Sequence, residues 1–168
     1  TLFTLPIQLG SAMETIDVAD LGAEDSPQNR ASVADALEAD DFAMNYYALD
    51  PGGAFTAGLH AHLDQEETFL VLEGEATFET APGPTADSET VTVGEGQLVR
   101  FDPGEYQQGR NESDAPLRAL AMGTPQESTD VRIAGPCEAC GDSDYLAFAM
   151  IDGQPGVECP ECGMQSAL

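Results

Sequence analysis

The sequence predicts an all-β protein: an antiparallel barrel or sandwich followed by a small module built on four cysteines. Short apolar or alternating segments recur between Gly- and Pro-rich turns, a pattern typical of antiparallel sheets. The four cysteines form two close pairs near the C-terminus, and the longer region before them contains none. A chain of 168 residues can bury one full core and carry one small satellite module.

The predicted elements follow one another along the chain. Helix-compatible apolar spacing predicts a short helix within residues 26–40, packed on the outside of the core. Strands are predicted at residues 42–47, 60–62, 69–72, 76–78, 91–93, 98–101, 117–122 and 145–151. The resulting division is an N-terminal extension at 1–12, a barrel at 13–124, a linker at 125–132 and the cysteine module at 133–168. For residues 1–12, a cloning remnant, an alternative start and a strand all stay open.

The charge of the chain excludes several classes of partner. The formal net charge is −26, from 31 acidic residues against 5 basic ones, all of them arginine. Such a surface repels nucleic acid and anionic lipid, which bind through Lys and Arg. No run approaches the roughly 18 apolar residues that span a bilayer. Because the acids are spread along the chain, and molar salt shortens the screening length to roughly 3 Å, we expect a protein of a high-salt cytoplasm.

Two histidines stand two residues apart, as His60-Ala61-His62. Alternate side chains of a strand project to the same face, so both imidazoles can bind one ion inside a barrel. Four residues separate His62 from Glu67, and six separate Glu67 from Gly74. Downstream come Gly96, the turn Asp102-Pro103-Gly104, Gln107 and Asn111.

This arrangement resembles the two signature motifs of the cupin superfamily, over residues 42–122. The resemblance implies an antiparallel, jelly-roll-like barrel with a divalent metal in its mouth, held by His60, His62 and Glu67. Glu66 is a weaker match, because only Glu67 leaves the six-residue gap before Gly74. The combination with a terminal cysteine module resembles small cupins of halophilic archaea.

Gln107 stands where the family has a third histidine. An amide oxygen is a neutral and poorer donor than imidazole, so we expect a weakly held Fe, Mn, Ni or Zn ion. One interpretation is a site of two histidines and one carboxylate, the ligand set of non-haem iron oxygen chemistry. The other is a binding pocket in which Gln107 and Gln108 hydrogen-bond an organic ligand.

Further pocket residues are proposed from their positions on or beside predicted strands. An arginine in so acidic a chain can hold a substrate carboxylate in a bidentate manner, although pairing with neighbouring acids is the simpler expectation. The candidates are Tyr46, Tyr47, Arg100, Tyr106 and Arg118.

The cysteine module contains two Cys-x-x-Cys-Gly knuckles, at Cys137/Cys140 and Cys159/Cys162. The 18 residues from Gly141 to Glu158 separate them, a spacing typical of zinc sites, and the whole resembles a zinc ribbon. Four thiolates complete a tetrahedral Zn²⁺, which predicts a structural metal. Residues 133–168 contain six acids and no Lys or Arg, which favours protein docking or dimer stabilisation over nucleic-acid binding.

Two functions are compatible with these motifs. The first is a metal-binding cupin-domain protein that binds a small organic ligand as a non-catalytic binding or sensing module. The alternative is a mononuclear metal enzyme of the dioxygenase or isomerase class that uses His60, His62 and Glu67. The expected partners are a small molecule, a second copy of the chain in a homodimer, and a protein bound through the ribbon.

Overall fold

The computed structural model describes residues 13–168, so the expectations for residues 1–12 lie outside it. Every strand predicted above is present, with bounds that differ by at most a few residues. The helical elements are η1 (Val18–Leu21), η2 (Ala23–Asp25) and α1 (Val33–Ala36). The strands are β1 (Arg30–Ser32), β2 (Ala43–Leu49), β3 (His60–His62), β4 (Glu66–Glu73), β5 (Glu75–Ala81), β6 (Glu89–Gly94), β7 (Leu98–Phe101), β8 (Tyr106–Arg110), β9 (Leu117–Thr124), β10 (Val131–Ala134), β11 (Tyr145–Ile151), β12 (Gln154–Glu158) and β13 (Gln165–Ala167).

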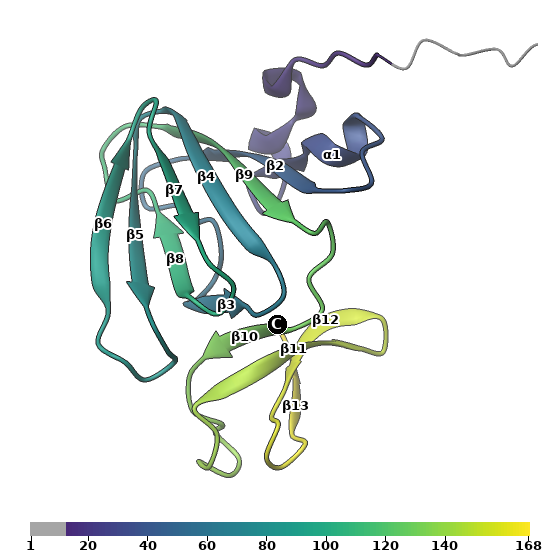
Figure 1. The fold of residues 1–168 in the computed structure, drawn as a ribbon, viewed down its shortest axis with the longest axis vertical. Coiled ribbons are helices and arrows are strands. Elements are labelled where there is room, and N and C mark those ends of the chain that lie inside the picture. The colour runs from purple at the N-terminus through teal and green to yellow at the C-terminus, as the bar shows by residue number, and fades with distance from the viewer. Residues whose placement is uncertain (1–12) are drawn as a thin grey trace, which may run out of the picture.

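The strands form two antiparallel sheets. The five-stranded sheet has the order β1-β2-β9-β4-β7, and the eight-stranded sheet has the order β13-β12-β11-β10-β3-β8-β5-β6. In Figure 1 the strands from β2 to β9 surround the barrel interior, and β10 to β13 form the ribbon below it. The predicted all-β class, a cupin-type antiparallel barrel followed by a small four-cysteine ribbon, is therefore confirmed.

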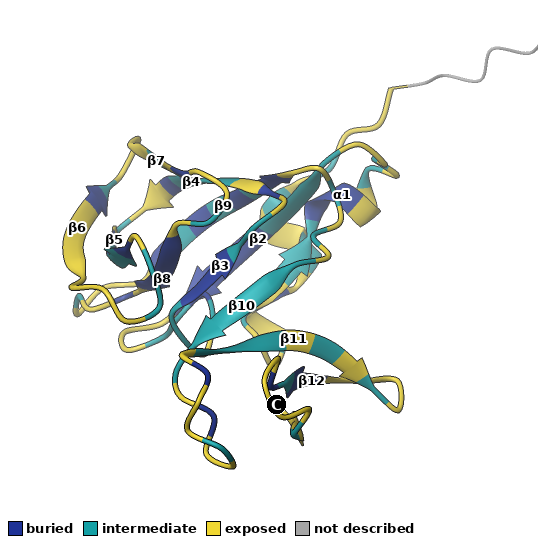
Figure 2. Cartoon of the chain, turned by 60° about the horizontal axis from the view of Figure 1, so that its bottom comes forward, coloured by how far each residue is buried: buried dark blue, intermediate teal, exposed yellow. Residues whose placement is uncertain are grey.

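Strand β10 joins the barrel to the ribbon. Its residues Val131 and Ile133 pair with His62 and His60 of β3, and its other edge pairs with β11. Figure 2 shows β10 lying along β3, with β11 beside it. The boundary expected between linker and ribbon, after residue 132, falls inside this strand. Four residues of mixed polarity carry little strand signal of their own, which is why β10 is absent from the predicted elements.

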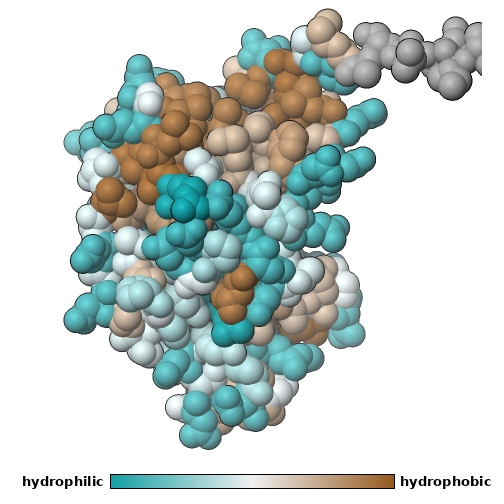
Figure 3. All heavy atoms as spheres, viewed as in Figure 1, coloured by the Kyte–Doolittle hydropathy of each residue, from teal (hydrophilic) through white to brown (hydrophobic). Residues whose placement is uncertain are grey.

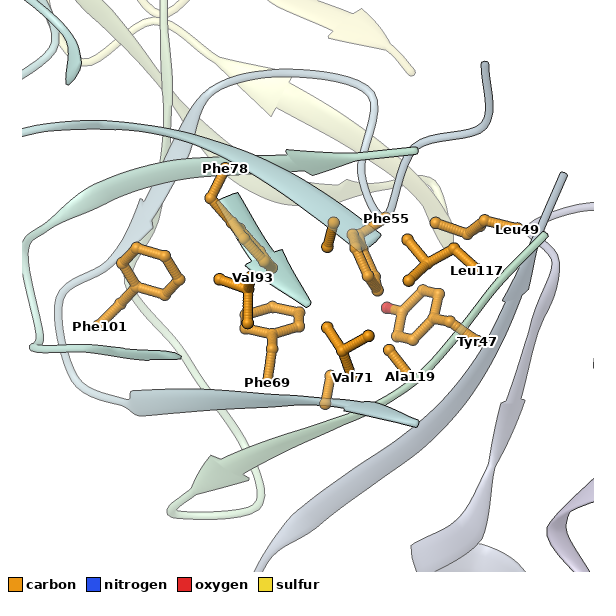
Figure 4. Close-up of a cluster of buried hydrophobic side chains, with 12 residues drawn as sticks. Tyr47, Leu49, Phe55, Phe69, Val71, Phe78, Val93, Phe101, Leu117 and Ala119 are labelled. Atoms are coloured by element: carbon orange, nitrogen blue, oxygen red, sulfur yellow. The ribbon is translucent and has the colours of Figure 1, made fainter. Parts of the chain in front are cut away.

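An aromatic cluster fills the barrel interior (Figure 4). The ring centroid of Phe55 lies 5.2 Å from that of Phe69 and 5.6 Å from that of Phe78. Phe78 is fully buried and also contacts Phe101, at 5.4 Å between centroids. A Cβ added at Gly109 would lie 2.5 Å from the Phe78 ring, so the glycine on β8 is needed for this packing.

The helix predicted within residues 26–40 is wrong in extent. The chain there forms the short strand β1, followed by the single turn α1. Asn29 has a left-handed φ of 49°, and β1 pairs with β2 instead of continuing a helix. The side chain of Ser32 then caps α1 by accepting a hydrogen bond from the Asp35 N–H. Sheet pairing has overridden local helix propensity.

The outer face of the five-stranded sheet is apolar beside the N-terminal elements. Met44 is paired with Met122 of β9, and Leu120 with Leu70, which is in turn paired with the 60% exposed Leu98. Figure 3 shows hydrophobic atoms gathered on this side of the molecule. A shallow hollow of about 410 Å³ lies here, lined in part by Met44, Thr68 and Met122.

Among residues 13–168 there is no helix with the length and apolar character required to cross a membrane.

Candidate metal centre

The barrel brings His60, His62 and Glu67 together, as their spacing predicts. One ligand atom from each lies within 4.8 Å of the others. The two histidines share one face of β3, and Glu67 is the second residue of β4 in the opposite sheet. Gln107 reaches the same point from β8, where it is paired with His60. Four donor side chains from three strands therefore converge inside the barrel.

The tautomer of His60 is fixed by its neighbours. Its Nδ1 lies 3.1 Å from the carbonyl oxygen of Gly58, which can only accept, so Nδ1 carries the proton. The lone pair of Nε2 then points toward Glu67 and Gln107. A ligating histidine is usually oriented in this way by a hydrogen bond from its other ring nitrogen. The geometry of His60 thus fits a metal ligand.

Gln107 donates from its amide nitrogen, 2.8 Å from Oε2 of Glu67 and 3.3 Å from Nε2 of His60. Its Oε1 is buried without a hydrogen-bond partner among the described residues. Rotating the amide by half a turn exchanges its nitrogen and oxygen. The oxygen would then point toward Glu67 and His60, where its lone pair could coordinate a cation. In the rotated orientation, the chemistry of this side chain is therefore compatible with a cation site.

Burial sets the charge of the ligand groups. It lowers the pKa of His62 to about 4, with a further contribution from His60, so the ring is neutral at pH 7. The contact of 3.6 Å between His62 Nε2 and Glu67 Oε2 is therefore not an ion pair at that pH. Burial also raises the pKa of Glu67 to about 7, against the hydrogen bond from Gln107. A neutral imidazole is the form that ligates a metal, and a bound cation would favour ionised Glu67.

The donor cluster lies in a cavity of about 390 Å³, within the usual size range of small-molecule sites. Both sheets and the ribbon contribute to its wall. Phe55 and Phe69 form its apolar base, and the polar residues Asn45, Gln65 and Gln126 also line it. Phe148 of β11 brings a ribbon side chain to the cavity. The hollow on the outer face, of similar size, has no cluster of ligating side chains among the described residues, so we assign the site to the barrel cavity.

Of the five pocket candidates proposed from the sequence, Tyr47 lines the cavity and the other four lie elsewhere. Tyr46 and Tyr47 are adjacent on β2 and face opposite ways, so Tyr47 lines the cavity while Tyr46 packs under the N-terminal segment. Tyr106 faces away from the cavity, because its neighbour on β8, Gln107, faces into it. Its ring is buried on the other side of the sheet, against Ala61 and Ala81. The arginines are ion-paired outside the cavity, Arg100 with Glu66 and Asp102 and Arg118 with Glu24.

Sequence reasoning missed Arg30 and Phe148, both of which line the cavity. Arg30 lies in β1, a strand hidden within a predicted helix, and Phe148 belongs to the ribbon. The alternation of β2 is the one signal that bears on Arg30, since Arg30 is paired with the inward-facing Tyr47.

The four cysteines form a second cluster, in the ribbon. The Sγ atoms of Cys137 and Cys162 are 3.8 Å apart, as are those of Cys140 and Cys159. Four sulfurs placed about 2.3 Å from a central Zn²⁺ in a tetrahedron are separated by about 3.8 Å, whereas a disulfide requires about 2.05 Å. The cluster therefore has the dimensions of a tetrahedral metal site.

The two knuckles repeat the same backbone turn. The N–H of Gly141 donates to the carbonyl of Cys137 at 2.8 Å, and that of Gly163 to Cys159 at 2.9 Å. Both glycines are left-handed, with φ of 72° and 71°, a conformation that glycine adopts without strain. Backbone N–H groups, chiefly that of Cys140, lower the pKa of Cys137 to about 7, whereas burial and the neighbouring thiols raise the pKa of Cys162 to about 12. Four thiolates together therefore require a bound cation.

Fold and site together define a cupin-type barrel with a cluster of side chains that could hold a metal ion. Residues 45–123 match the family model described as "Cupin domain". A double-stranded β-helix protein of unassigned function from Klebsiella pneumoniae is similar over 73% of this chain and 98% of its own, with 20% identity and a TM-score of 0.56. These findings support membership of the cupin superfamily.

Two further solved structures share the fold at low identity. A sugar phosphate isomerase from Silicibacter pomeroyi, described as a cupin, is 21% identical with a TM-score of 0.55, over 87% of this chain and 79% of its own. A recombinant oxalate oxidase bound to glycolate is 15% identical with a TM-score of 0.58, over 74% of this chain and 65% of its own. No curated protein matches the sequence. Likeness at these identities shows the fold alone.

Proposed function

We propose that the barrel holds a divalent cation on His60, His62 and Glu67, with Gln107 as a weak fourth ligand, and binds a small organic molecule beside it. The convergence of ligand atoms from His60, His62 and Glu67 within 4.8 Å, in a cavity of about 390 Å³, is the observation that carries the proposal. The described ribbon cysteines would hold a second, structural Zn²⁺. The protein then acts as a binding or sensing module.

The non-catalytic role is favoured by what else lines the cavity. Apart from the three proposed ligands, the titratable side chains among the described lining residues are Arg30 and Tyr47. Burial raises the pKa of Tyr47 above its usual value, and arginine stays protonated, so neither is a general base near pH 7. Proton transfer would have to use a ligand of the metal.

A metal enzyme is the second candidate. Two histidines and one carboxylate leave coordination positions open for a substrate or for oxygen, and this donor set is associated with non-haem iron. The cavity wall gives such a substrate room beside the ligands. The dioxygenase and isomerase classes both remain compatible with this arrangement.

Metal analysis tests the site. Protein purified without a chelator or a histidine tag should contain two metals per chain by elemental analysis, and Glu67→Gln should lose the barrel metal but keep the ribbon zinc. Glu66→Gln is the matched control, because Glu66 is the adjacent residue and pairs with Arg100 on the outside of the barrel. Two metals per chain in Glu67→Gln would refute the ligand set.

We also propose that the fold is adapted to high salt, because 31 acids face only 5 arginines. Screening in molar salt removes most of the self-repulsion of such a surface. The melting temperature should therefore rise with KCl concentration. An unchanged melting temperature from dilute buffer to molar KCl would contradict the proposed adaptation to high salt.

The homodimer is a related proposal. The apolar outer face around Leu70, Leu98 and Leu120 would cover itself against a second copy, since exposed apolar patches of this kind commonly mark interfaces. Sedimentation of Leu98→Glu against wild-type protein would test it, with a monomeric wild type as the contrary result.

A further inference from the structure

The cavity differs in charge from the rest of the molecule. The chain has 31 acidic residues, yet Glu67 is the one acid among the described residues that line the cavity. The other polar lining groups are histidines, amides, hydroxyls and Arg30. With a divalent cation bound, the cavity would carry a net positive charge inside a protein of net charge −26.

Arg30 is directed toward this cavity from the edge of the five-stranded sheet. It is paired with Tyr47, and cross-strand partners project to the same face of a sheet, so Arg30 shares the inward face of Tyr47. Both residues line the cavity. Arg30 is also exposed, so its guanidinium is accessible to a ligand that enters from solvent.

Most arginines of the described chain are neutralised by acids. Arg100, Arg118 and Arg132 each lie within 4.0 Å of a carboxylate. Arg30 and Arg110 have no such partner among residues 13–168. Arg110 lines a separate hollow of about 80 Å³ and donates to Gln108. Arg30 is therefore the one arginine among the described residues that line the cavity, and no described carboxylate lies within 4.0 Å of it despite the large excess of acids.

Tyr47 links Arg30 to the proposed metal ligands. Burial raises the pKa of the Tyr47 hydroxyl, the Arg30 guanidinium lowers it, and Glu67 raises it. The charges of Arg30 and Glu67 both act on the Tyr47 hydroxyl, so Tyr47 lies near both residues. A small molecule near Tyr47 could approach the metal site with one end and Arg30 with the other.

We propose that Arg30 binds the anionic group, a carboxylate or a phosphate, of a small ligand whose opposite end faces the metal site. The planar guanidinium presents paired N–H donors that match two oxygens of either anion. Molar salt, with a screening length of roughly 3 Å, screens the long-range repulsion of the surface and weakens a contact at hydrogen-bond distance less. This inference rests on the proposed function, because it specifies the ligand of the same cavity.

Calorimetric titration in molar KCl tests the proposal on metal-loaded protein. The probes are malate for the carboxylate, glycerol 3-phosphate for the phosphate, and glycerol as the neutral control. We expect one of the two anions to bind the wild type and glycerol not to bind. Arg30→Gln should weaken that binding at least tenfold, in the range expected for hydrogen bonds to charged groups, while Arg30→Lys recovers part of it. The anion that binds shows whether Arg30 recognises a carboxylate or a phosphate.

Arg110→Gln is the matched control, since it removes the same charge outside the cavity and should leave anion binding unchanged. Equal affinities of wild type and Arg30→Gln, or binding of neither anion to the wild type, would overturn the proposal. Loss of barrel metal from Arg30→Gln would also overturn it, because Arg30 would then act on the metal site. If wild-type protein bound no barrel metal, the proposed function would fail, and the same comparison on metal-free protein would still support or overturn the anion site.

Discussion

The barrel and the ribbon are stabilised in different ways. The barrel packs an aromatic cluster with Phe55, Phe69 and Phe78 at its centre, all at most 6% exposed. From residue 135 onward, the buried apolar residues are Val157 and two of the cysteines, Cys137 and Cys159. A module with so little core usually depends on a metal for its folding free energy. The two candidate metal sites therefore have opposite relations to the fold: the barrel supports its site, whereas the ribbon would be supported by its own.

The largest expected effect is in the ribbon. Cys137→Ser removes a buried ligand, and structural zinc contributes about 10–16 kcal/mol in small zinc modules. We expect loss of the ribbon zinc and of amide protection in β11 and β12, measured by elemental analysis and hydrogen exchange. Glu161→Gln, in the second knuckle, is the control and should keep both. Retained zinc and protection in Cys137→Ser would mean that the ribbon folds without its metal.

The stability of the barrel should depend on the packing of its core rather than on a metal ligand. Phe78→Ala removes a fully buried ring that contacts Phe55, Phe69 and Phe101, and should lower the free energy of unfolding by about 3–5 kcal/mol. Urea unfolding followed by tyrosine fluorescence measures this loss. Val91→Ala, at a residue that is 39% exposed, should change it by less than about 1 kcal/mol. A comparable loss in both variants would show that the aromatic cluster is not the source of barrel stability.

The barrel site should instead destabilise the metal-free fold. The Glu67 pKa of about 7 lies above its unfolded value, so the folded state keeps a proton that the unfolded state releases between about pH 4.5 and 7. Stability from this group therefore falls as pH rises through that window. His62, with its lowered pKa of about 4, acts in the opposite direction as pH falls below about 6.5. The two effects oppose each other between about pH 4.5 and 6.5.

Glu67→Gln separates these two contributions. In protein stripped of barrel metal, the variant should gain about 2–3 kcal/mol relative to wild type between pH 4.5 and 7.5, because its amide does not ionise. Urea unfolding at both pH values measures the change, and Glu66→Gln should show no such gain. If the difference in free energy of unfolding between Glu67→Gln and wild type did not change with pH, the raised pKa of Glu67 would be contradicted.

The smallest effect concerns Gln107. Gln107→His should tighten metal binding about tenfold, or about 1.4 kcal/mol, if the other ligands are already arranged around an ion. A site arranged around a cation predicts this gain whether or not it is catalytic, whereas a pocket relaxed around an organic ligand alone predicts little. Titration of Fe(II), Mn(II), Ni(II) and Zn(II) into chelated wild type and variant distinguishes them. No binding to either protein would show that the barrel has lost its metal function.

The two ligand clusters could be predicted because short-range spacing determines them. His60 and His62 share a strand face, and each cysteine knuckle is a local turn, so these parts require no knowledge of distant contacts, whereas Glu67 was predicted from its match to the cupin motif. Arg30 and Phe148 depend on pairings between segments far apart in sequence. Alternation shows that Tyr46 and Tyr47 face opposite ways but not which of them faces the core, so the sequence could not choose between them. The sequence does not show that Arg100, a pocket candidate, pairs with Glu66 of the neighbouring strand β4.

The β3–β10 pair has a consequence for how the chain can be divided. In the sheet order, β3 lies between β10 and β8, so a chain shortened before Val131 would leave β3 as an edge strand. The unpaired backbone groups of an edge strand are a template for association with other chains. The truncated barrel would then expose at its rim the strand that carries both histidines, and two such barrels could pair through it. Ribbon and barrel are therefore poor cassettes for exchange between proteins, although their motifs are separate in the sequence.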